Sequence, residues 1–470
     1  MTLPAETLLE LVRASRGFVV MGGQQYRATD LVSAARAAAA GLRARGVGHD
    51  DGVVMVDDGD GADLLACVLG AWWVGARPAV VGGATAPEEL TSIRNQTGAA
   101  LSLRCLPTIH HDGPTYADLL ASDAVTAPEA TCAPGDVALD LVSSGTTGTP
   151  KCVSFAHTGL SHNVSAYARR LGLTRHDVLY SPLPLSVAGV LGMVVLPGLL
   201  ADAIVHVGRL SGSRIANAHR QVRLARPTLV YGVPYTYEVL SRKAGAGGYD
   251  DLRWAICSSA PLPAPTFDRI RRHLGVPPRN SYCLAEAGTV TLNTATSDRT
   301  LRETVGEPLD GVTIRVEPVS PGDAAGRIVV GGVNHGLGYR RAGRLEPFPG
   351  GEVRTSDLGS LREGTLTLSG RADQVIQVAG QNIDLSHVHR LVSGCPGLGD
   401  FALTVGHHPR LGPVPILLAE SGSLTASPRE VIDFCRSVLR DVEVPREVRV
   451  VDVIPRTDTG KVRLTDAGQR

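Results

Sequence analysis

The hydrophobic positions along the first 140 residues change repeatedly between two spacings, which predicts helices alternating with buried strands. Helical spacing over residues 31–42 predicts a helix that ends at Gly46. Apolar runs at 53–56 and 79–81 predict short strands, with another helix over 62–73 between them. This β-α-β order is typical of parallel sheets with flanking helices, so the sequence predicts an α/β fold.

The same alternation continues to about residue 370. We predict a strand over 136–142, a helix over 158–171, and short buried strands at 229–231 and 254–257. From residue 312 the pattern changes to short alternating strands separated by glycine-rich turns. The sequence therefore predicts a large, multi-layer N-terminal domain whose sheets are mostly parallel.

The last hundred or so residues predict a separate, small α+β unit. Apolar runs indicate strands at 401–405, 415–418 and 448–453. We place the boundary in the segment 369–374, giving an N-terminal domain of residues 1–372 and a mobile C-terminal domain of residues 373–470.

One helix of the C-terminal unit is marked clearly in the sequence. Ser427 has the side chain of an N-cap, Pro428 fits the first helical position, and Glu430 completes a capping box. The apolar positions that follow form a single stripe at helical spacing.

Composition narrows the class of protein. Apolar residues make up 43% of the chain, and 46 basic residues balance 46 acidic ones, which disfavours nucleic acid and membranes as partners. Eight cysteines are scattered without a CxxC pair, which favours reduced thiols in the cytoplasm. We interpret the apolar stretch 184–201 as a buried core segment, because glycines and a proline interrupt it and Asp202 follows.

Lysine is rare, and its positions are informative. The three lysines are Lys151, Lys243 and Lys461, while arginine provides the other basic residues. A compact ammonium cannot be replaced by a planar guanidinium at a tight site. Lys151 and Lys461 stand in GTTGTPK and PRTDTGK, so we predict functional roles for both, whereas Lys243 is typical of a solvated loop.

The segment 142–155 has the composition of an anion-binding loop. Its glycines allow backbone N–H groups to turn toward a phosphate, and its hydroxyl side chains add donors. The residues concerned are Ser144, Gly145, Thr146, Thr147 and Gly148, followed by the ammonium of Lys151. It differs from a P-loop because a proline precedes the lysine and a strand follows it.

SSGTTGTPK resembles the phosphate-binding signature of the adenylate-forming superfamily, which includes acyl-CoA synthetases, peptide-synthetase adenylation domains and luciferases. The family's other signatures are resembled in the expected order by residues 280–286, 350–359, 369–383 and 454–464. The resemblance covers essentially the whole chain. Taken alone, Asp357 is more typical of a turn or a helix cap, Glu286 of a solvated carboxylate, and Lys461 of a surface lysine, and their motif context changes that interpretation.

The resemblance implies ATP and Mg²⁺ as cofactors and assigns a role to each motif. Glu286 corresponds to the Mg²⁺ carboxylate, and Lys461 to the lysine that bridges the acid and the α-phosphate; with Lys151 they form the predicted catalytic set. Asp373 corresponds to the hinge between domains. The implied ATP- and AMP-binding set is Ser144, Gly145, Thr146, Thr147, Gly148, Ser259, Tyr282 near the adenine, Cys283, Ala285, Asp357 at the ribose hydroxyls, and Arg371 at the ribose and phosphate.

Several positions depart from the family pattern. Cys283 stands in place of a glycine, and Ala285 in place of a threonine that touches the α-phosphate. Asn382 replaces a basic residue, His389 an acidic one, and Ser356 a glycine. Because Asp357 and Lys461 are retained, we expect adenylation to survive, and these changes bear on the second half-reaction.

The resemblance also places the acid-binding pocket. The predicted lining is small or apolar with one aromatic wall, and comprises Ser186, Gly189, Tyr231, Val233, Ser258 and Gly288. Amino-acid adenylation domains hold the substrate ammonium with an aspartate in the first lining stretch, where this chain offers Ser186. A buried ammonium without a counterion is costly, so a small aromatic or medium-length aliphatic acid is favoured over an α-amino acid.

The resulting hypothesis is an ATP-dependent ligase that forms an acyl-AMP, releases pyrophosphate, and transfers the acyl group to a thiol of CoA or of a carrier-protein phosphopantetheine. One alternative ends on nitrogen, as in amide synthetases or in diazotases that activate nitrite against an aromatic amine. A second is a non-catalytic nucleotide-binding protein. We expect a monomer or homodimer, with a small carboxylic acid and possibly an acyl carrier protein as partners.

Overall fold

A mostly parallel sheet organises the middle of the chain. The computed structural model describes residues 7–58, 61–104, 114–121, 129–143, 150–208, 215–241, 249–260, 262, 264–318, 325–372, 375–378, 381–408 and 411–454. This sheet has the order β12-β11-β10-β8-β9-β1-β2, in which the pairs from β12 to β1 are parallel and β2 is antiparallel. Its strands are β1 (Phe18–Met21), β2 (Gln24–Arg27), β8 (Val178–Ser181), β9 (Ile204–Val207), β10 (Leu229–Gly232), β11 (Trp254–Cys257) and β12 (Pro278–Asn280).

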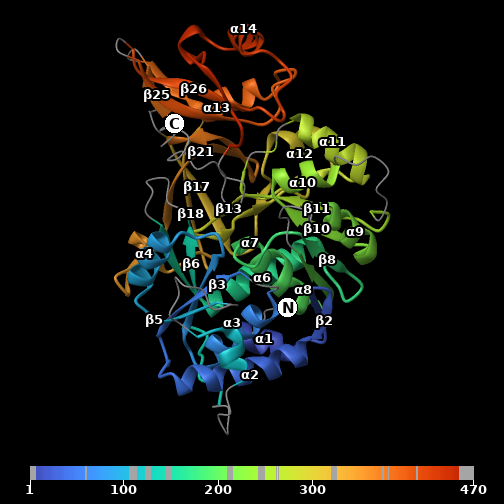
Figure 1. Cartoon of the computed structure of the whole chain (residues 1–470), viewed down its shortest axis with the longest axis vertical. Helices are drawn as coiled ribbons and strands as arrows, with labels where there is room; N and C mark the ends of the chain where they lie inside the picture. The colour runs from blue at the N-terminus through green and yellow to red at the C-terminus, as the bar shows by residue number, and fades with distance from the viewer. Residues whose placement is uncertain are drawn as a thin grey trace.

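Helices flank these strands as the alternating pattern predicts. Helix α6 ends where Gly172 adopts a left-handed conformation, which a glycine tolerates without a steric penalty. The helices of this part of the chain are α6 (His157–Leu171), α9 (Ile215–Ala225), α10 (Pro234–Ser241), α11 (Ala264–Leu274) and α12 (Asp298–Glu303). Of these, α9, α10 and α11 directly follow the parallel strands β9, β10 and β11. Figure 1 shows α9 to α12 together on one flank of the molecule.

A smaller parallel sheet lies in the N-terminal part of the chain, with the order β4-β3-β5. Helix α3 has its ten C-terminal residues buried, and α2 buries an alanine-rich stripe. Helix α2 ends at Ala44, two residues before the predicted end at Gly46. Gly46 itself follows the C-cap residue and has a left-handed φ of 79°. The elements are α1 (Leu8–Ala14), α2 (Ala28–Ala44), β3 (Gly52–Asp57), α3 (Ala62–Trp73), β4 (Arg77–Gly82), α4 (Pro87–Thr97), β5 (Ala99–Leu103) and α5 (Tyr116–Leu120).

Two four-stranded antiparallel sheets complete the larger part of the molecule, in agreement with the change of pattern at residue 312. Their orders are β20-β19-β7-β6 and β17-β18-β21-β22. The strands are β6 (Val137–Ser143), β7 (Lys151–Ala156), β17 (Val312–Pro318), β18 (Gly326–Gly332), β19 (Gly338–Arg341), β20 (Arg344–Pro347), β21 (Val353–Arg362) and β22 (Thr365–Arg371), with a 3₁₀ turn at Pro349–Gly351.

A buried ionic cluster fixes β6, β7 and β19 to one another. The carboxylate of Asp140 contacts the guanidinium of Arg77 and accepts a hydrogen bond from Ser154 Oγ at 2.5 Å. Arg340 Nε donates to the same Ser154 Oγ at 3.1 Å and lies 3.6 Å from Asp140 Oδ1. All four side chains are buried, so removing one partner would leave an unpaired charge inside the protein. The cluster thereby sets the register of the strands that carry Lys151 and Tyr339.

The C-terminal part has its own hydrophobic cluster, with members between Val378 and Val444, whereas the largest cluster extends from Leu8 to Leu366. A three-stranded sheet, β25-β26-β27, packs with two helices. Figure 1 shows these elements at the opposite end of the molecule from α1 to α3. They are β23 (Val375–Val378), β24 (Gln381–Asp384), α13 (Leu385–Val392), β25 (Phe401–His408), β26 (Gly412–Glu420), α14 (Pro428–Val438), a 3₁₀ turn at Asp441–Glu443, and β27 (Val448–Val451).

The predicted capping box of α14 is confirmed. Ser427 accepts a hydrogen bond from the backbone of Glu430, the Glu430 carboxylate accepts one in return, and Pro428 occupies the first helical position. The neighbouring strand β27 ends at Val451, two residues before the predicted end.

The apolar stretch 184–201 is broken into short helical pieces. These are α7 (Ala188–Val190), a π-helical turn (Leu191–Val195) and α8 (Leu196–Leu200), and most of their residues are buried in the main core. Within the part of the chain that the structure describes, no helix has both the length and the apolar character needed to cross a membrane.

Candidate active site

The short segment 281–288 connects three groups of the predicted site residues. It contains β13 (Cys283–Leu284), which pairs with β14 (Gly288–Thr289) as a tight antiparallel hairpin, and β15 (Thr291–Leu292) and β16 (Glu307–Pro308) form a second small pair beside it. From this segment Tyr282, Cys283 and Glu286 each contact a different set of partners. The hairpin thus determines how the three groups are spaced.

The first group surrounds Asp357. This residue pairs with Arg371 across β21 and β22, and Arg371 Nη1 donates to Asp357 Oδ1 at 3.0 Å. Tyr282 Oη donates to Asp357 Oδ2 at 2.5 Å, a contact that the sequence did not predict. Both Asp357 and Tyr282 are buried. Burial and the adjacent carboxylate raise the pKa of Tyr282 far above its usual value, so its hydroxyl stays protonated and acts as a donor.

The second group surrounds Glu286. Its carboxylate oxygen Oε1 accepts a hydrogen bond from Tyr339 Oη at 3.0 Å, and its backbone carbonyl accepts one from Gly336 N at 2.9 Å. Lys151, at the exposed start of β7, has its Nζ 5.8 Å from the centre of the Tyr339 ring. Tyr339 is a residue that sequence reasoning missed, because nothing in GLGYRR distinguishes it from other tyrosines.

The chemistry of the second group fits Mg²⁺. Mg²⁺ keeps several waters and is usually held by one or two carboxylates together with substrate phosphates, not by a cage of protein ligands. Glu286 is half-buried, and its second oxygen, Oε2, receives no hydrogen bond from the described residues. Among those residues no three His, Cys, Asp or Glu side chains gather into a group that could hold a metal ion.

The third group is the predicted acid pocket, centred on Tyr231. This tyrosine is buried, and its Oη lies 2.9 Å from Ser258 Oγ. A Cβ atom on Gly189 would lie only 1.9 Å from Tyr231 Oη, so no larger residue fits there without moving the tyrosine. Ser259 has φ of 73° in the left-handed region, which few non-glycine residues adopt and which marks the turn after β11 as conformationally constrained.

Cys283 adds a thiol to the same region. Its Sγ lies 3.7 Å from Met193 Sδ and 3.5 Å from Ser281 Oγ. The surrounding protein raises the pKa of the thiol by desolvation, although the hydroxyls of Ser281, Thr289 and Ser258 oppose this shift. Cys283 is therefore a neutral, hydrogen-bonded side chain and not an activated nucleophile.

The remaining predicted residues of the described chain lie close to these groups or beside them. Gly288 adopts φ of 65° against Asn163, Val233 is buried after β10, and Ala285 is half-buried. The predicted residues Ser144, Gly145, Thr146, Thr147, Gly148, Asp373 and Lys461 lie outside the described residues.

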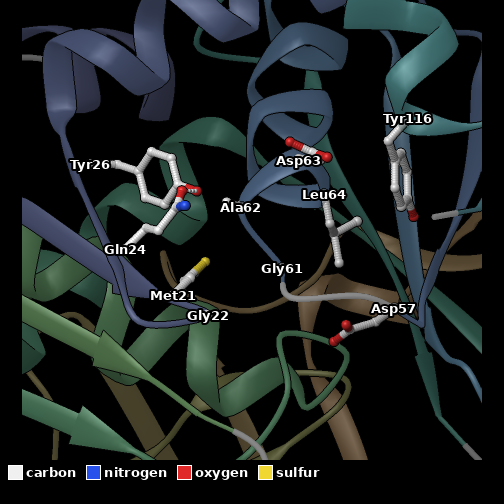
Figure 2. Close-up of a pocket in the computed structure, with 10 residues that line it drawn as sticks. All are labelled: Met21, Gly22, Gln24, Tyr26, Asp57, Gly61, Ala62, Asp63, Leu64 and Tyr116. Atoms are coloured by element: carbon white, nitrogen blue, oxygen red, sulfur yellow. Dashed lines mark hydrogen bonds between the residues drawn. The ribbon is translucent and has the colours of Figure 1, made fainter.

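Ser186 contacts a carboxylate from another strand. Its backbone N–H donates to Oδ2 of the buried Asp57 at 2.9 Å. Asp57 also lines a cavity of about 250 Å³ between the β1–β2 hairpin and the start of α3, where the side chains of Asp63 and Tyr116 are also found (Figure 2).

Comparisons with known proteins identify the family to which the sequence is similar. The profile of a family described as AMP-binding enzyme matches residues 12–340. A feruloyl-CoA synthase from Amycolatopsis is 29% identical over 353 residues, which cover 71% of this chain and 70% of the synthase.

Solved structures share the whole fold. ATP-bound MatB from Rhodopseudomonas palustris superimposes with a TM-score of 0.85 at 23% identity, covering 99% of this chain and 98% of that one. The o-succinylbenzoate coenzyme A synthetase of Bacillus subtilis, in complex with ATP and a magnesium ion, gives a TM-score of 0.83 at 20% identity, covering 97% and 98%. The predicted α/β fold with a small C-terminal α+β part is confirmed.

Proposed function

Because the chain belongs to the family of AMP-binding enzymes, and is an AMP-forming enzyme of the acid–CoA ligase type, we propose that it adenylates a small aromatic carboxylic acid and passes the acyl group to a thiol. The observation that carries the proposal is the hairpin segment 281–288. It joins a buried carboxylate that has two donors and a half-buried carboxylate that is bonded to a tyrosine facing a lysine. It also lies near a buried tyrosine that contacts a serine hydroxyl.

The proposed reaction has two steps. In the first, a carboxylate oxygen of the acid attacks the α-phosphorus of ATP, a new P–O bond forms, and the bond to pyrophosphate breaks. In the second, a thiolate attacks the carbonyl carbon of the acyl-AMP, and AMP leaves with the bonding electron pair. Both steps build negative charge on phosphate oxygens, so fixed cations and donors near those oxygens accelerate them.

Each residue of the described site has a proposed part in this chemistry. Asp357, held by Arg371, accepts hydrogen bonds from the ribose hydroxyls, and Lys151 provides a positive charge for the phosphates. Glu286 would hold Mg²⁺, which when bound neutralises charge on the phosphates of ATP. Lys461, with the loop of residues 144–148, is proposed to complete the phosphate contacts on the basis of sequence resemblance.

The choice of acid rests on the third group. Tyr231 and Gly189 present a flat, apolar wall, and the nearby polar atoms are the neutral hydroxyls and thiol of Ser258 and Cys283. A planar ring packs well against such a wall, whereas the ammonium of an α-amino acid finds no counterion among these residues. The feruloyl-CoA synthase similarity supports an aromatic acid and CoA as acceptor.

We also propose that the chain divides into units of residues 1–372 and 373–470 and that the second moves about Asp373 between the two steps. The separate hydrophobic cluster of the C-terminal part supports this division. The β23–β24 hairpin would then lie near the acyl-AMP when the thiol enters.

Pyrophosphate exchange into ATP tests the proposal directly. The panel contains aromatic, fatty and amino acids, with one arm that replaces the acid by nitrite, and the Lys461→Ala variant runs beside the wild type. Exchange that depends on an aromatic acid and disappears in the variant supports the proposal. Exchange with nitrite alone would contradict the proposal and support a diazotase that activates nitrite. ATP binding without any exchange would support a non-catalytic nucleotide-binding protein.

A product assay decides the acceptor. The acid that supports exchange is incubated with ATP and CoA, with a phosphopantetheinylated carrier protein, or with hydroxylamine, and the products are identified by mass spectrometry. Acyl-CoA or an acylated carrier supports the thiol step. Hydroxamate alone, with neither thiol acylated, would contradict it.

A further inference from the structure

Tyr339 lies between the two oppositely charged side chains of the second group. On one side its Oη donates to Glu286 Oε1 at 3.0 Å. On the other, the Nζ of Lys151 lies 5.8 Å from the ring centre, within the range of a cation–π contact. One tyrosine therefore touches both the carboxylate proposed for Mg²⁺ and the ammonium proposed for the phosphates.

The ring of Tyr339 is held in place by its surroundings. Phe348 packs against it edge-on, with 5.1 Å between the ring centres and an angle of 86°. Tyr339 also pairs with Val153 in the antiparallel register of β19 and β7, two residues beyond Lys151. The phenol oxygen thus has a fixed position relative to the strand that carries the lysine.

The segment before Tyr339 holds the backbone of Glu286. Gly336 N donates to the Glu286 carbonyl at 2.9 Å, and a Cβ on Gly336 would lie 2.6 Å from Val153 Cγ1 and 3.1 Å from that carbonyl oxygen. Glu286 is consequently fixed by the same short segment at its backbone and at its carboxylate. Such a contact restricts the side chain to one orientation before any ligand arrives.

The hydrogen bond from Tyr339 uses one oxygen of the Glu286 carboxylate. The Tyr339 hydroxyl donates to Oε1, which accepts, and this leaves Oε2 as the oxygen available to a cation.

Building on the function proposed above, we propose that Tyr339 is a positioning residue that orients the Glu286 carboxylate for Mg²⁺ and sets its spacing from Lys151. Partners that orient metal-binding carboxylates typically change metal affinity or activity by about 10- to 100-fold when removed. Tyr339 acts through Glu286 and Lys151 and takes no part in bond making.

The test compares ATP binding with and without Mg²⁺. Calorimetry gives the Kd of ATP in excess Mg²⁺ and in excess EDTA, for the wild type and for Tyr339→Phe. The phenylalanine keeps the ring, its packing on Phe348 and the contact with Lys151, and removes only the hydroxyl. We expect the affinity gained from Mg²⁺ to fall about tenfold while the Kd in EDTA stays unchanged.

Two further variants make the result specific. Tyr339→Leu also removes the ring face, so we expect the Kd in EDTA to rise as well, because Lys151 loses its contact. Tyr116→Phe is the matched control: Tyr116 Oη donates to the carbonyl of Val56 at 2.7 Å, so it removes a buried hydroxyl from another part of the fold. In this control, the increase in ATP affinity on adding Mg²⁺ should equal that of the wild type.

The outcomes separate this inference from the proposed function. If the folded Tyr339→Phe variant gains as much ATP affinity from Mg²⁺ as the wild type does, the inference is overturned. Acid-dependent exchange by the wild type would be unaffected by that result. An equal loss in Tyr116→Phe would also overturn the inference, because the effect would then be one of general stability. Failure of the proposed function would instead be seen as absence of exchange in the wild type.

Discussion

Two carboxylate–tyrosine pairs lie on either side of the 281–288 hairpin, and they differ in what surrounds them. Tyr282 donates to Asp357 at 2.5 Å in a buried setting, where Arg371 occupies the other carboxylate oxygen at 3.0 Å. Tyr339 donates to Glu286 at 3.0 Å in a half-buried setting, with the exposed Lys151 over the ring. The chemical pair is the same, and its environment is not.

This difference determines which kind of ligand each carboxylate can bind. Asp357 has a fixed donor on each oxygen, so it suits hydrogen bonding to a neutral ligand and contributes to the stability of the fold. Glu286 has one oxygen engaged by a described residue, so it can bind a cation without breaking an existing contact. A charged group's role therefore depends on how many of its lone pairs the fold already uses.

The largest expected effect concerns stability at the buried pair. Asp357→Ala removes two hydrogen bonds to a charged group, so the free energy of unfolding should fall by about 3 kcal/mol. Glu286→Ala should cost less than about 1 kcal/mol, because a half-buried carboxylate is more easily replaced by water. Urea denaturation at neutral pH measures both. An equal loss of unfolding free energy in the two variants would show that burial does not make the two carboxylates differ in their contribution to stability.

For activity we expect the opposite order: the dependence of pyrophosphate exchange on Mg²⁺ concentration should change more when Glu286 is substituted than when Asp357 is. Glu286→Gln keeps an oxygen that can accept from Tyr339 but loses the charge, so pyrophosphate exchange at limiting Mg²⁺ should fall about 100-fold. Excess Mg²⁺ should recover part of the rate, and the melting temperature should change by less than about 2 °C.

Asp357→Asn is the companion to that variant. Its exchange rate should be reduced to the same extent at every Mg²⁺ concentration, because the change alters the proposed ribose contact and the bonds to Tyr282 and Arg371, none of which involves Mg²⁺. The distinction between the two pairs would be lost if excess Mg²⁺ restored the exchange rate of Asp357→Asn. It would also be lost if excess Mg²⁺ failed to restore the rate of Glu286→Gln.

A smaller effect, on pH dependence, comes from His157. This buried histidine accepts a hydrogen bond from Leu8 N at 3.2 Å, and burial lowers its pKa to about 4 from 6.5. Between those values the unfolded chain binds a proton that the folded chain does not, so stability present above pH 6.5 is lost as the pH falls. At about pH 5 the loss should reach roughly 2 kcal/mol.

The His157→Gln variant tests this assignment, because glutamine can accept the same hydrogen bond but does not titrate. Thermal melts between pH 5 and pH 7 should then depend less on pH than those of the wild type. An unchanged slope would place the acid-sensitive groups elsewhere in the protein. The comparison of the pairs is therefore best made above pH 7.

The parts of the fold that sequence predicted well are those determined by local contacts. Helix α3 and strand β11 have the predicted bounds, and α14 begins at its predicted capping box. In each case the signal, a run of apolar residues or a cap, lies within the element itself. The groups in which Asp357 meets Arg371 and Tyr231 meets Ser258 were expected only through resemblance to a family, and distances came only with the structure.

Other features depend on strand pairing between distant parts of the chain. Tyr339 lies near Lys151 because β19 pairs with β7, and Arg340 contacts Ser154 across a separation of 186 residues. No periodicity within GLGYRR carries that information. A single aspartate within the apolar run VALDLVS was the one local sign of the buried cluster, since a charge in a buried strand requires a partner.

The compactness of the 281–288 hairpin has a consequence for the evolution of this enzyme. Because Tyr282, Cys283 and Glu286 share one tight turn, an insertion or a backbone shift there would move their three sets of contacts together. With the proposed roles, binding of the nucleotide, the acid and the cation would then change at once. Gly189 is constrained differently, because a single added methyl group there would lie 1.9 Å from Tyr231 Oη and displace that side chain. A change of specificity at Gly189 is therefore expected to need a compensating change at Tyr231 alone.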